Sequence, residues 1–177
     1  MALGHIHSKN ILHRDLKPKN IMLSKNDNIK IGDFGISKML ENTFDMAKTA
    51  TGTPYYLSPE VCLGQKYDHK SDMWMLGCIL YELCALKRPF DGDSISQVLN
   101  KITKSNPPAL SSDFDPIFQE LIDLLLQKNA SLRASIHEIL NIQRIKQNVI
   151  QIKERSSHNS STDKEHLKKI QYIPPIS

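Results

Sequence analysis

Three polar side chains of different chemistry lie within six residues near the start of the chain: the carboxylate of Asp15, the ammonium of Lys17 and the carboxamide of Asn20. A carboxylate can accept or orient a proton, an ammonium can meet an anion as a point charge, and a carboxamide oxygen is a hard ligand suited to Mg²⁺. A further carboxylate, Asp33, follows. Singly, each of these residues is most often a solvated surface group, so only their arrangement along the chain can indicate a site.

The elements expected around these residues are short. Residues 1–9 read as the last turns of a helix. Residues 21–23 and 29–31 are short apolar runs separated by a polar turn at 26–28, which predicts a small β-hairpin. Residues 37–57 show no clear period and are rich in Thr, with a Gly and a Pro near the end, which predicts a long loop. Loops of that length are uncommon in compact domains unless they are functional.

Farther along the chain, the apolar spacing predicts helices. Residues 71–86 are apolar nearly all the way round, which is typical of a buried helix, and Trp74, Ile79 and Leu83 are its expected core residues. Further helices are expected to begin at Ser94 with Gln97, at Asp115 with Pro116, and at Ser135 with Glu138. The fold class is therefore predicted to be mainly α, with a small β-hairpin.

The chain is expected to hold one domain and a tail. Residues 1–142 carry the helical periodicity, whereas residues 143–177 are polar and lack aromatic content for most of their length. The stretch ERSSHNSSTDKEH has too few apolar residues to build a core, so the tail is predicted to be largely disordered, with at most weak helix on either side of this stretch.

Composition narrows the classes of partner. The formal net charge is +4, and the basic residues are spread out, so we expect no nucleic-acid partner. No apolar run approaches the roughly 20 residues that span a bilayer, and the first residues lack a signal-peptide pattern, so we expect no membrane partner. The expected location is intracellular and cytoplasmic, with a nuclear or cytoskeletal association left open.

Three short motifs follow one another in a fixed order: HRDLKPKN at residues 13–20, DFG at 33–35 and SPE at 58–60. Each string alone is weak, but in this order and spacing they resemble the protein-kinase signature H-R-D-x-x-x-x-N, D-F-G and A-P-E. The resemblance runs from residue 1 to about 142. It implies the C-terminal lobe of the protein-kinase fold and phosphoryl transfer from ATP to serine or threonine hydroxyls of protein substrates, with Mg²⁺ as the metal cofactor.

The resemblance also implies roles for individual residues of the site. Asp15 would accept or orient the proton of the attacking hydroxyl, and Lys17 would contact the transferring phosphoryl group. Asn20 and Asp33 would hold Mg²⁺, and with Lys17 they would contact the nucleotide. Met22 would form the floor of the adenine pocket.

Other residues would support the site without taking part in the chemistry. The resemblance places His13 beneath Phe34 as structural support and not as a general base. It implies that Asp72 holds the backbone of the catalytic loop and that Glu60 pairs with Arg133 in a buried ion pair.

The longer strings GDFGISKML, GTPYYLSPEVC and GCILYELCALKRPF look most like the NIMA-related kinases. Lys17 and Thr53 are similar to the corresponding residues of serine/threonine kinases. Arg14 directly precedes the catalytic aspartate, as in kinases that loop phosphorylation activates, and Thr49 occupies the position phosphorylated in many relatives. The resemblance therefore implies regulation at Thr49 by an upstream kinase or by autophosphorylation.

The N-terminal lobe is expected to be absent from this sequence. In kinases a Gly-rich loop and a strand lysine precede the catalytic loop, and only twelve residues precede His13 here. Two classes of function remain open: a serine/threonine kinase represented by a fragment without the N-terminal lobe, and a catalytically inactive kinase-like interaction or regulatory module. The retained Asp15, Asn20 and Asp33 favour the first class, and the missing lobe favours the second.

Overall fold

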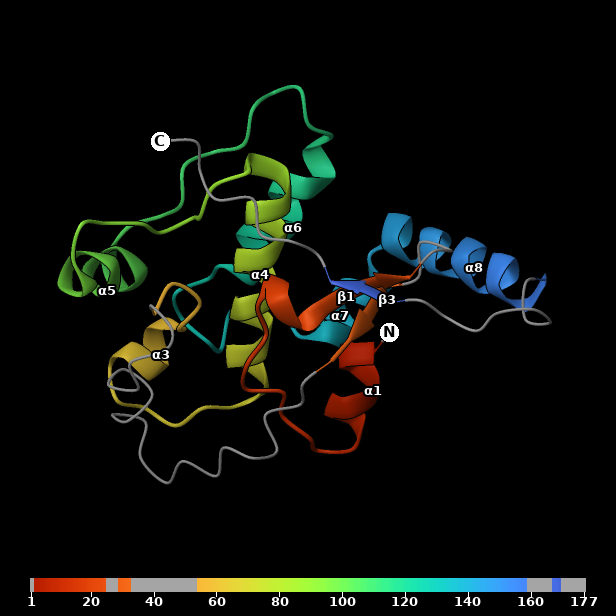
Figure 1. Ribbon diagram of the computed structural model, residues 1–177, viewed down its shortest axis with the longest axis horizontal. Coiled ribbons are helices and arrows are strands. Elements are labelled where there is room, and N and C mark those ends of the chain that lie inside the picture. Colours follow the sequence, from red (N-terminus) through yellow and green to blue (C-terminus); the bar gives the residue numbers. More distant parts are fainter. Residues whose placement is uncertain (1, 25–28, 33–53, 159–166, 170–177) are drawn as a thin grey trace.

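The computed structural model describes residues 2–24, 29–32, 54–158 and 167–169. Along the chain they form α1 (Ala2–Ser8), a 3₁₀ turn η1 (Pro18–Asn20), β1 (Ile21–Ser24), β2 (Ile29–Ile31), α3 (Pro59–Cys62), α4 (His69–Ala85), α5 (Ile95–Lys104), α6 (Pro116–Leu125), α7 (Ile136–Asn141), α8 (Gln143–His158) and β3 (Leu167–Lys169) (Figure 1). The mainly helical architecture with a small hairpin is confirmed.

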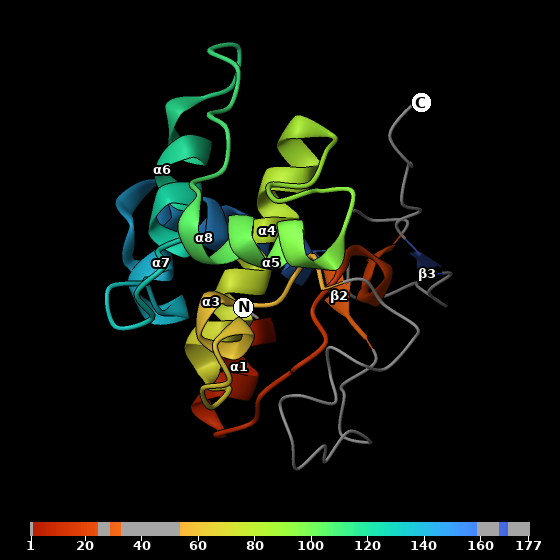
Figure 2. The same cartoon turned by 90° about the vertical axis from the view of Figure 1, so that its left-hand side faces the viewer.

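Helix α4 runs through the middle of the described fold, with α6 packed along it (Figures 1 and 2). Met73 and Ile79 of α4 belong to one hydrophobic core, which it shares with α1, α6 and α7. Trp74 and Cys78 face a second core, which includes residues of α5 and α6. Because α4 contributes to two cores on different sides, its sequence is apolar nearly all the way round, and its prediction as a buried helix is confirmed.

The prediction that Leu83 is a core residue was wrong. Its side chain is 55% exposed, whereas Ile79, one turn earlier on the same face, is 2% exposed. Leu83 belongs to neither core because its face of α4 extends past the first core, whereas Ala85 in the same turn still packs against the second core. The helix ends at Ala85, and its C-cap Leu86 has the left-handed φ of 54° that is common just after helices.

Two of the predicted helix starts differ in how completely they are capped. Ser135 and Glu138 form a full capping box, in which Oγ of Ser135 accepts from the Glu138 N–H at 3.3 Å and Oε2 of Glu138 accepts from the Ser135 N–H at 2.7 Å. The hydroxyl of Ser94 accepts from the Gln97 N–H at 3.2 Å, but the Gln97 side chain accepts from Asp93. The helices begin as predicted, and only the first has the reciprocal cap.

The predicted hairpin is present. β1 pairs antiparallel with β2, with Ile21 opposite Ile31 and Met22 opposite Lys30. The predicted turn at 26–28 and most of the predicted loop at 37–57 lie outside the described residues. β3 adds to the other side of β1, which gives the strand order β2-β1-β3.

Beyond residue 142 the structure differs from the expectation of a largely disordered tail. α8 spans Gln143–His158 and packs against α7. Ile145, spaced helically from Ile142 and Val149, packs against the first core, and Nη1 of Arg144 donates to Oδ1 of Asp115 at 2.8 Å. This short apolar stripe is enough to dock the helix, although the segment has no aromatic residue. Within the described ranges, no helix is long and apolar enough to cross a membrane.

Candidate active site

The backbone of the catalytic loop is held by the buried carboxylate of Asp72, at the start of α4. The N–H of His13 donates to Oδ2 at 2.9 Å, and the N–H of Arg14 donates to Oδ1 at 3.0 Å. Arg14 has a φ of 67°, a left-handed conformation that residues other than glycine rarely adopt. Asp72 thus fixes the strained residue that directly precedes Asp15.

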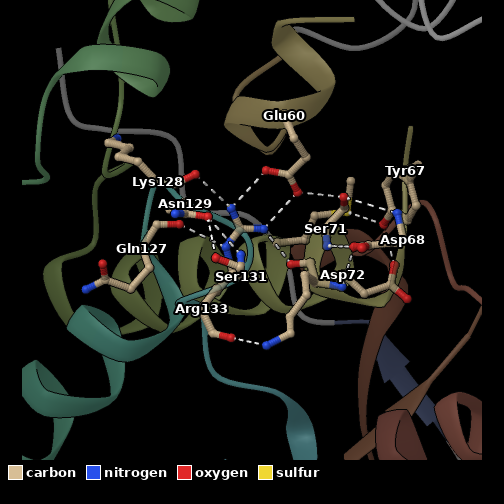
Figure 3. A network of polar contacts seen from close by, with 12 residues as sticks. Glu60, Tyr67, Asp68, Ser71, Asp72, Gln127, Lys128, Asn129, Ser131 and Arg133 are labelled. Carbon is tan, nitrogen blue, oxygen red and sulfur yellow. Dashed lines mark hydrogen bonds and ion pairs between the residues drawn. The ribbon is translucent and has the colours of Figure 1, made fainter. Parts of the chain in front are cut away.

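Asp72 also binds two side chains that the sequence analysis did not identify. Nε2 of His7 in α1 lies 2.8 Å from Oδ2. The hydroxyl of Tyr67 donates to Oδ1 (Figure 3). Burial alone would raise the pKa of Asp72, but the hydrogen bonds from His7, Tyr67 and the loop backbone outweigh it and lower this pKa. Asp72 therefore remains a carboxylate. Neither His7 nor Tyr67 stands in a motif used above, so no signal in the sequence identified them.

The three polar residues singled out first lie together. Nζ of Lys17 donates to both carboxylate oxygens of Asp15, at 2.9 and 2.8 Å. Nδ2 of Asn20 donates to the backbone oxygen of Asp15 at 2.8 Å and to its Oδ2 at 3.1 Å. The side chains of Asp15 and Lys17 are each 37% exposed and so are accessible from solvent, whereas Asn20 is buried.

Both ring nitrogens of His13 are engaged with backbone groups. Nδ1 accepts from the Asp15 N–H at 3.3 Å, so it is unprotonated, and Nε2 lies 3.2 Å from the carbonyl oxygen of Gly32, to which it donates. His13 is completely buried, and Leu16 in the same loop is 2% exposed in the first core. The histidine thus anchors the loop through its backbone and leaves no ring nitrogen for a metal. Its expected contact with Phe34 lies outside the described residues.

A buried ion pair joins the short helix α3 to the turn after α6. Nη1 and Nη2 of Arg133 donate to Oε1 and Oε2 of Glu60 at 2.8 and 2.9 Å, which is the pair that the sequence predicted (Figure 3). Ser71 donates to Oε1 at 2.7 Å. Burial alone would raise the pKa of Glu60, but the hydrogen bonds and charge of Arg133, together with Ser71, hold it at about 2.

Arg133 has further partners that satisfy its remaining donors. Its Nε donates to the carbonyl of Gln127 at 3.0 Å, and Nη1 also donates to the carbonyl of Lys70 at 2.7 Å. The ammonium of Lys70 in turn donates to the carbonyl of Arg133. The complete burial of the Arg133 guanidinium is not prohibitive because its N–H groups donate hydrogen bonds to these acceptors. The network joins α3, α4 and the turn after α6 to one another.

Lys128 lies beside this network on an aromatic surface. Its Nζ is 4.2 Å from the ring centroid of Phe90 and 4.8 Å from that of Trp74, two rings that stack at 5.5 Å. It donates to the carbonyl of Ile102 at 2.7 Å. Burial lowers the pKa of this ammonium to about 8. Lys128 stands in none of the sequence motifs.

Several predicted site residues cannot be placed against this geometry. Asp33, Phe34, Thr49 and Thr53 lie outside the described residues. Met22 is half-buried in β1, two residues after Asn20. Among the described residues no group of three or more His, Cys, Asp or Glu side chains could hold a metal ion. The predicted Mg²⁺ ligands are therefore one described residue, Asn20, and one residue outside this range.

Comparison with known proteins gives a consistent family assignment. The protein kinase domain model matches residues 1–145. The chain is 48% identical over 141 residues to the human serine/threonine-protein kinase Nek5, and this region covers 79% of the chain and 20% of Nek5.

Other relatives carry the same family name. The chain is 44% identical over 142 residues to the nekl-2 kinase of Caenorhabditis elegans, covering 80% of the chain and 40% of that relative. It is 42% identical over 164 residues to Nek11 of Macaca fascicularis, covering 93% of the chain and 26% of that relative. The chain thus spans less than half the length of each of these relatives. Its resemblance to the NIMA-related kinases is confirmed.

Proposed function

The chain belongs to the protein kinase domain family, of the NIMA-related type, and we propose from this premise that it provides the catalytic loop of a serine/threonine protein kinase. The reaction is transfer of the terminal phosphoryl group of ATP to a serine or threonine hydroxyl of a protein substrate. The observation that supports it most directly is the assembly of Asp15, Lys17 and Asn20, in which the two other side chains both donate to the carboxylate of Asp15.

In this proposal Asp15 orients the acceptor hydroxyl and takes its proton. Lys17 holds both carboxylate oxygens at 2.9 and 2.8 Å, which fixes the direction of the carboxylate and keeps a positive charge where phosphate oxygens arrive. The backbone beneath is fixed through Asp72, so the geometry is set before substrate binds. Phosphoryl transfer depends on this kind of positioning and charge neutralisation more than on covalent chemistry.

The donor set fits a hard cation. Among the described residues, the side chain of Asn20 makes both of its hydrogen bonds through Nδ2, which leaves its carboxamide oxygen for a metal ligand. With Asp33 this would provide two oxygen ligands for Mg²⁺. The chemistry that Mg²⁺ would supply at these residues is neutralisation of the phosphate charge. Met22, in the strand that follows Asn20, would contact the adenine.

Regulation at Thr49 is part of the same proposal. A phosphate on Thr49 adds close to two negative charges at neutral pH. The guanidinium of Arg14 would meet it, since Arg14 stands beside Asp15 with its backbone fixed by Asp72. Autophosphorylation or an upstream kinase would supply the phosphate. We further propose an intracellular location, on the sequence grounds given above.

The proposal can be tested in a chimera. Residues 1–142 of this chain replace the matching segment of human Nek5, to which they are 48% identical over 141 residues. We expect the chimera to transfer labelled phosphate from ATP to a threonine-containing protein substrate, and Asp15→Asn to lower the rate at least about 10³-fold, because general-base and positioning contributions are of that order. Asp113→Asn, at an exposed acid away from the loop, is the matched control and should leave the rate unchanged.

The result also separates the two classes of function. A folded chimera with no transfer would support the inactive, regulatory module instead of the kinase. The same assay on the 177-residue chain alone should give little transfer, because the groups that hold the nucleotide phosphates from above come from another part of the kinase fold.

A further inference from the structure

The chain's own tail returns to the small sheet as a strand. β3 (Leu167–Lys169) pairs antiparallel with β1, which lies in the middle of the order β2-β1-β3, and Figure 1 shows the two strands side by side. The match to the protein kinase domain ends at residue 145. β3 therefore comes from residues outside the kinase-domain match, whereas β1, with which it pairs, lies inside that match.

One contact determines which backbone groups of β1 face this added strand. The Gly32 N–H donates to the carbonyl of Asn20 at 2.9 Å, on the β2 side. In an antiparallel sheet, successive residues turn their N–H and C=O groups to opposite sides, so those of Met22 face β2 and those of Leu23 face β3. Leu23 lies opposite Lys168. Lys168 is therefore the tail residue whose backbone meets the outward groups of β1.

Without β3, the outward groups of β1 would form an open strand edge. Such an edge is a template for any extended segment, and proteins usually cover it. The tail is well placed to do so because residues 159–166 alone connect it to the end of α8, and a tether this short keeps the effective concentration of the strand in the millimolar range. Two of the three residues of β3 are lysines, a residue type that discourages the addition of a further strand.

We propose that the outer edge of β1 is a docking site for an extended peptide strand and that residues 167–169 occupy this site within the chain. Recognition is through backbone hydrogen bonds, as when a peptide adds a strand to an exposed sheet edge. Met22 lies opposite Lys169, so the docked strand restrains the strand that carries the proposed adenine contact. That last consequence rests on the proposed function, whereas the docking itself does not.

The variant Lys168→Pro tests the docking in the full 177-residue chain, because proline has no N–H to donate. Amide hydrogen exchange is measured by NMR at Leu23, which faces the tail, and at Met22, which faces β2. We expect exchange at Leu23 to rise at least about threefold, because losing the Lys168 N–H, which would donate to the Leu23 carbonyl, weakens the docked strand by about the worth of one hydrogen bond and leaves the Leu23 N–H open more often, while exchange at Met22 stays unchanged.

Two matched variants isolate the cause. Lys168→Ala removes the side chain and keeps the N–H, and Ser161→Pro places a proline outside β3; both should leave exchange at Leu23 unchanged. An unchanged Leu23 in Lys168→Pro would overturn the proposal. An equal rise at Leu23 and Met22 would also overturn it, because the proline would then be loosening the whole hairpin and not its edge.

A peptide added in trans tests whether the edge is a true docking site. The peptide KEHLKKIQ, residues 164–171, added at millimolar concentration to the Lys168→Pro variant, should restore protection at Leu23. The same peptide with proline at the position of Lys168 should not. Failure of the first peptide to restore protection would contradict a docking site, whatever the outcome of the kinase assay.

Discussion

Nε2 of His7 lies 2.8 Å from Oδ2 of Asp72, although 65 residues separate them in the chain. The contact joins α1 to the start of α4, at the same carboxylate that holds the backbone of His13 and Arg14. The last turn of α1 is thus connected through one oxygen to the loop that carries Asp15. The order of the catalytic loop consequently depends on a histidine outside every kinase motif discussed above.

Replacing His7 should therefore loosen the catalytic loop. We expect His7→Leu to lower the free energy of unfolding by about 1–2 kcal/mol, because the buried Oδ2 of Asp72 loses a donor. His7→Gln keeps a donor of similar reach and should cost less. Urea unfolding measures the stability, and amide exchange at His13 and Arg14 measures the local effect. Equal values for the two variants would show that the donor is not what matters.

Acid should weaken the fold through Glu60. Its pKa is about 2 in the folded chain and ordinarily 4.5, so between these values the unfolded chain binds more protons. The contribution of Glu60 to stability is then fully present above about pH 4.5 and is lost as the pH falls towards 2. The difference in unfolding free energy between the parent chain and Glu60→Gln should shrink over this window.

The exposed Glu120 provides the matched control for this experiment. Glu120→Gln should show no comparable change from pH 6 to pH 2.5. Asp72, whose pKa is also lowered, is present in all three proteins. Its contribution to the unfolding free energy therefore cancels when two of the proteins are compared. A constant difference between the parent chain and Glu60→Gln across the window would mean that the Arg133 contact does not keep Glu60 ionised.

The elements with strong local signals were predictable from the sequence. α4 is apolar all the way round because Met73 and Trp74, adjacent in the chain, belong to two different cores. The cap at Ser135 follows from its own motif. The prediction that Leu83 is a core residue was wrong because helical periodicity shows only which face of α4 a residue occupies. It does not show how far along the helix the core extends. That limit is set by packing with elements far away in the sequence.

The candidate site also contains some contacts that the sequence indicated and others that it did not. The motif order was enough to select Asp15, Lys17 and Asn20, and these residues do lie together. The contact of His7 with Asp72 depends on how α1 lies against the start of α4, which no local pattern specifies. Tyr67 is only five residues from Asp72 in the chain, but it stands in no motif. The helical spacing of Ile142, Ile145 and Val149 could have predicted a helix docked near the start of the tail. Three apolar residues in an otherwise polar segment are, however, weak evidence for a docked helix.

Raising the pH should change the contribution that the half-buried Lys128 makes to the stability of the fold. Its pKa is about 8 in the folded chain and ordinarily 10.5, so between these values the unfolded chain binds more protons and stability rises with pH. We expect the parent chain to gain stability relative to Lys128→Met from pH 8 to pH 10.5. Chemical unfolding at several pH values measures this. Parallel curves for the two proteins would indicate that the ammonium stays fully charged against Phe90 and Trp74.

Two glycines in helices should respond in opposite ways to alanine. Alanine favours a helix over glycine by up to about 1 kcal/mol. A Cβ at Gly4 in α1 would meet Ile136 Cγ1 at 3.5 Å, an ordinary contact, so Gly4→Ala should be neutral or stabilising. A Cβ at Gly77 in α4 would lie 2.7 Å from Leu126 Cδ2 and 2.8 Å from Leu125 Cβ.

At Gly77 the clash should therefore outweigh the gain in helix propensity. Overpacking of a core costs about 1–3 kcal/mol, and Cβ of Leu125 cannot move without shifting α6 itself. We expect Gly77→Ala to lower the unfolding free energy by about 1–2 kcal/mol in urea, with Gly4→Ala as its matched control. If Gly77→Ala were as stable as Gly4→Ala, α6 would have to move away from α4 at little cost. The close approach of these two helices would then not be what requires a glycine at this position.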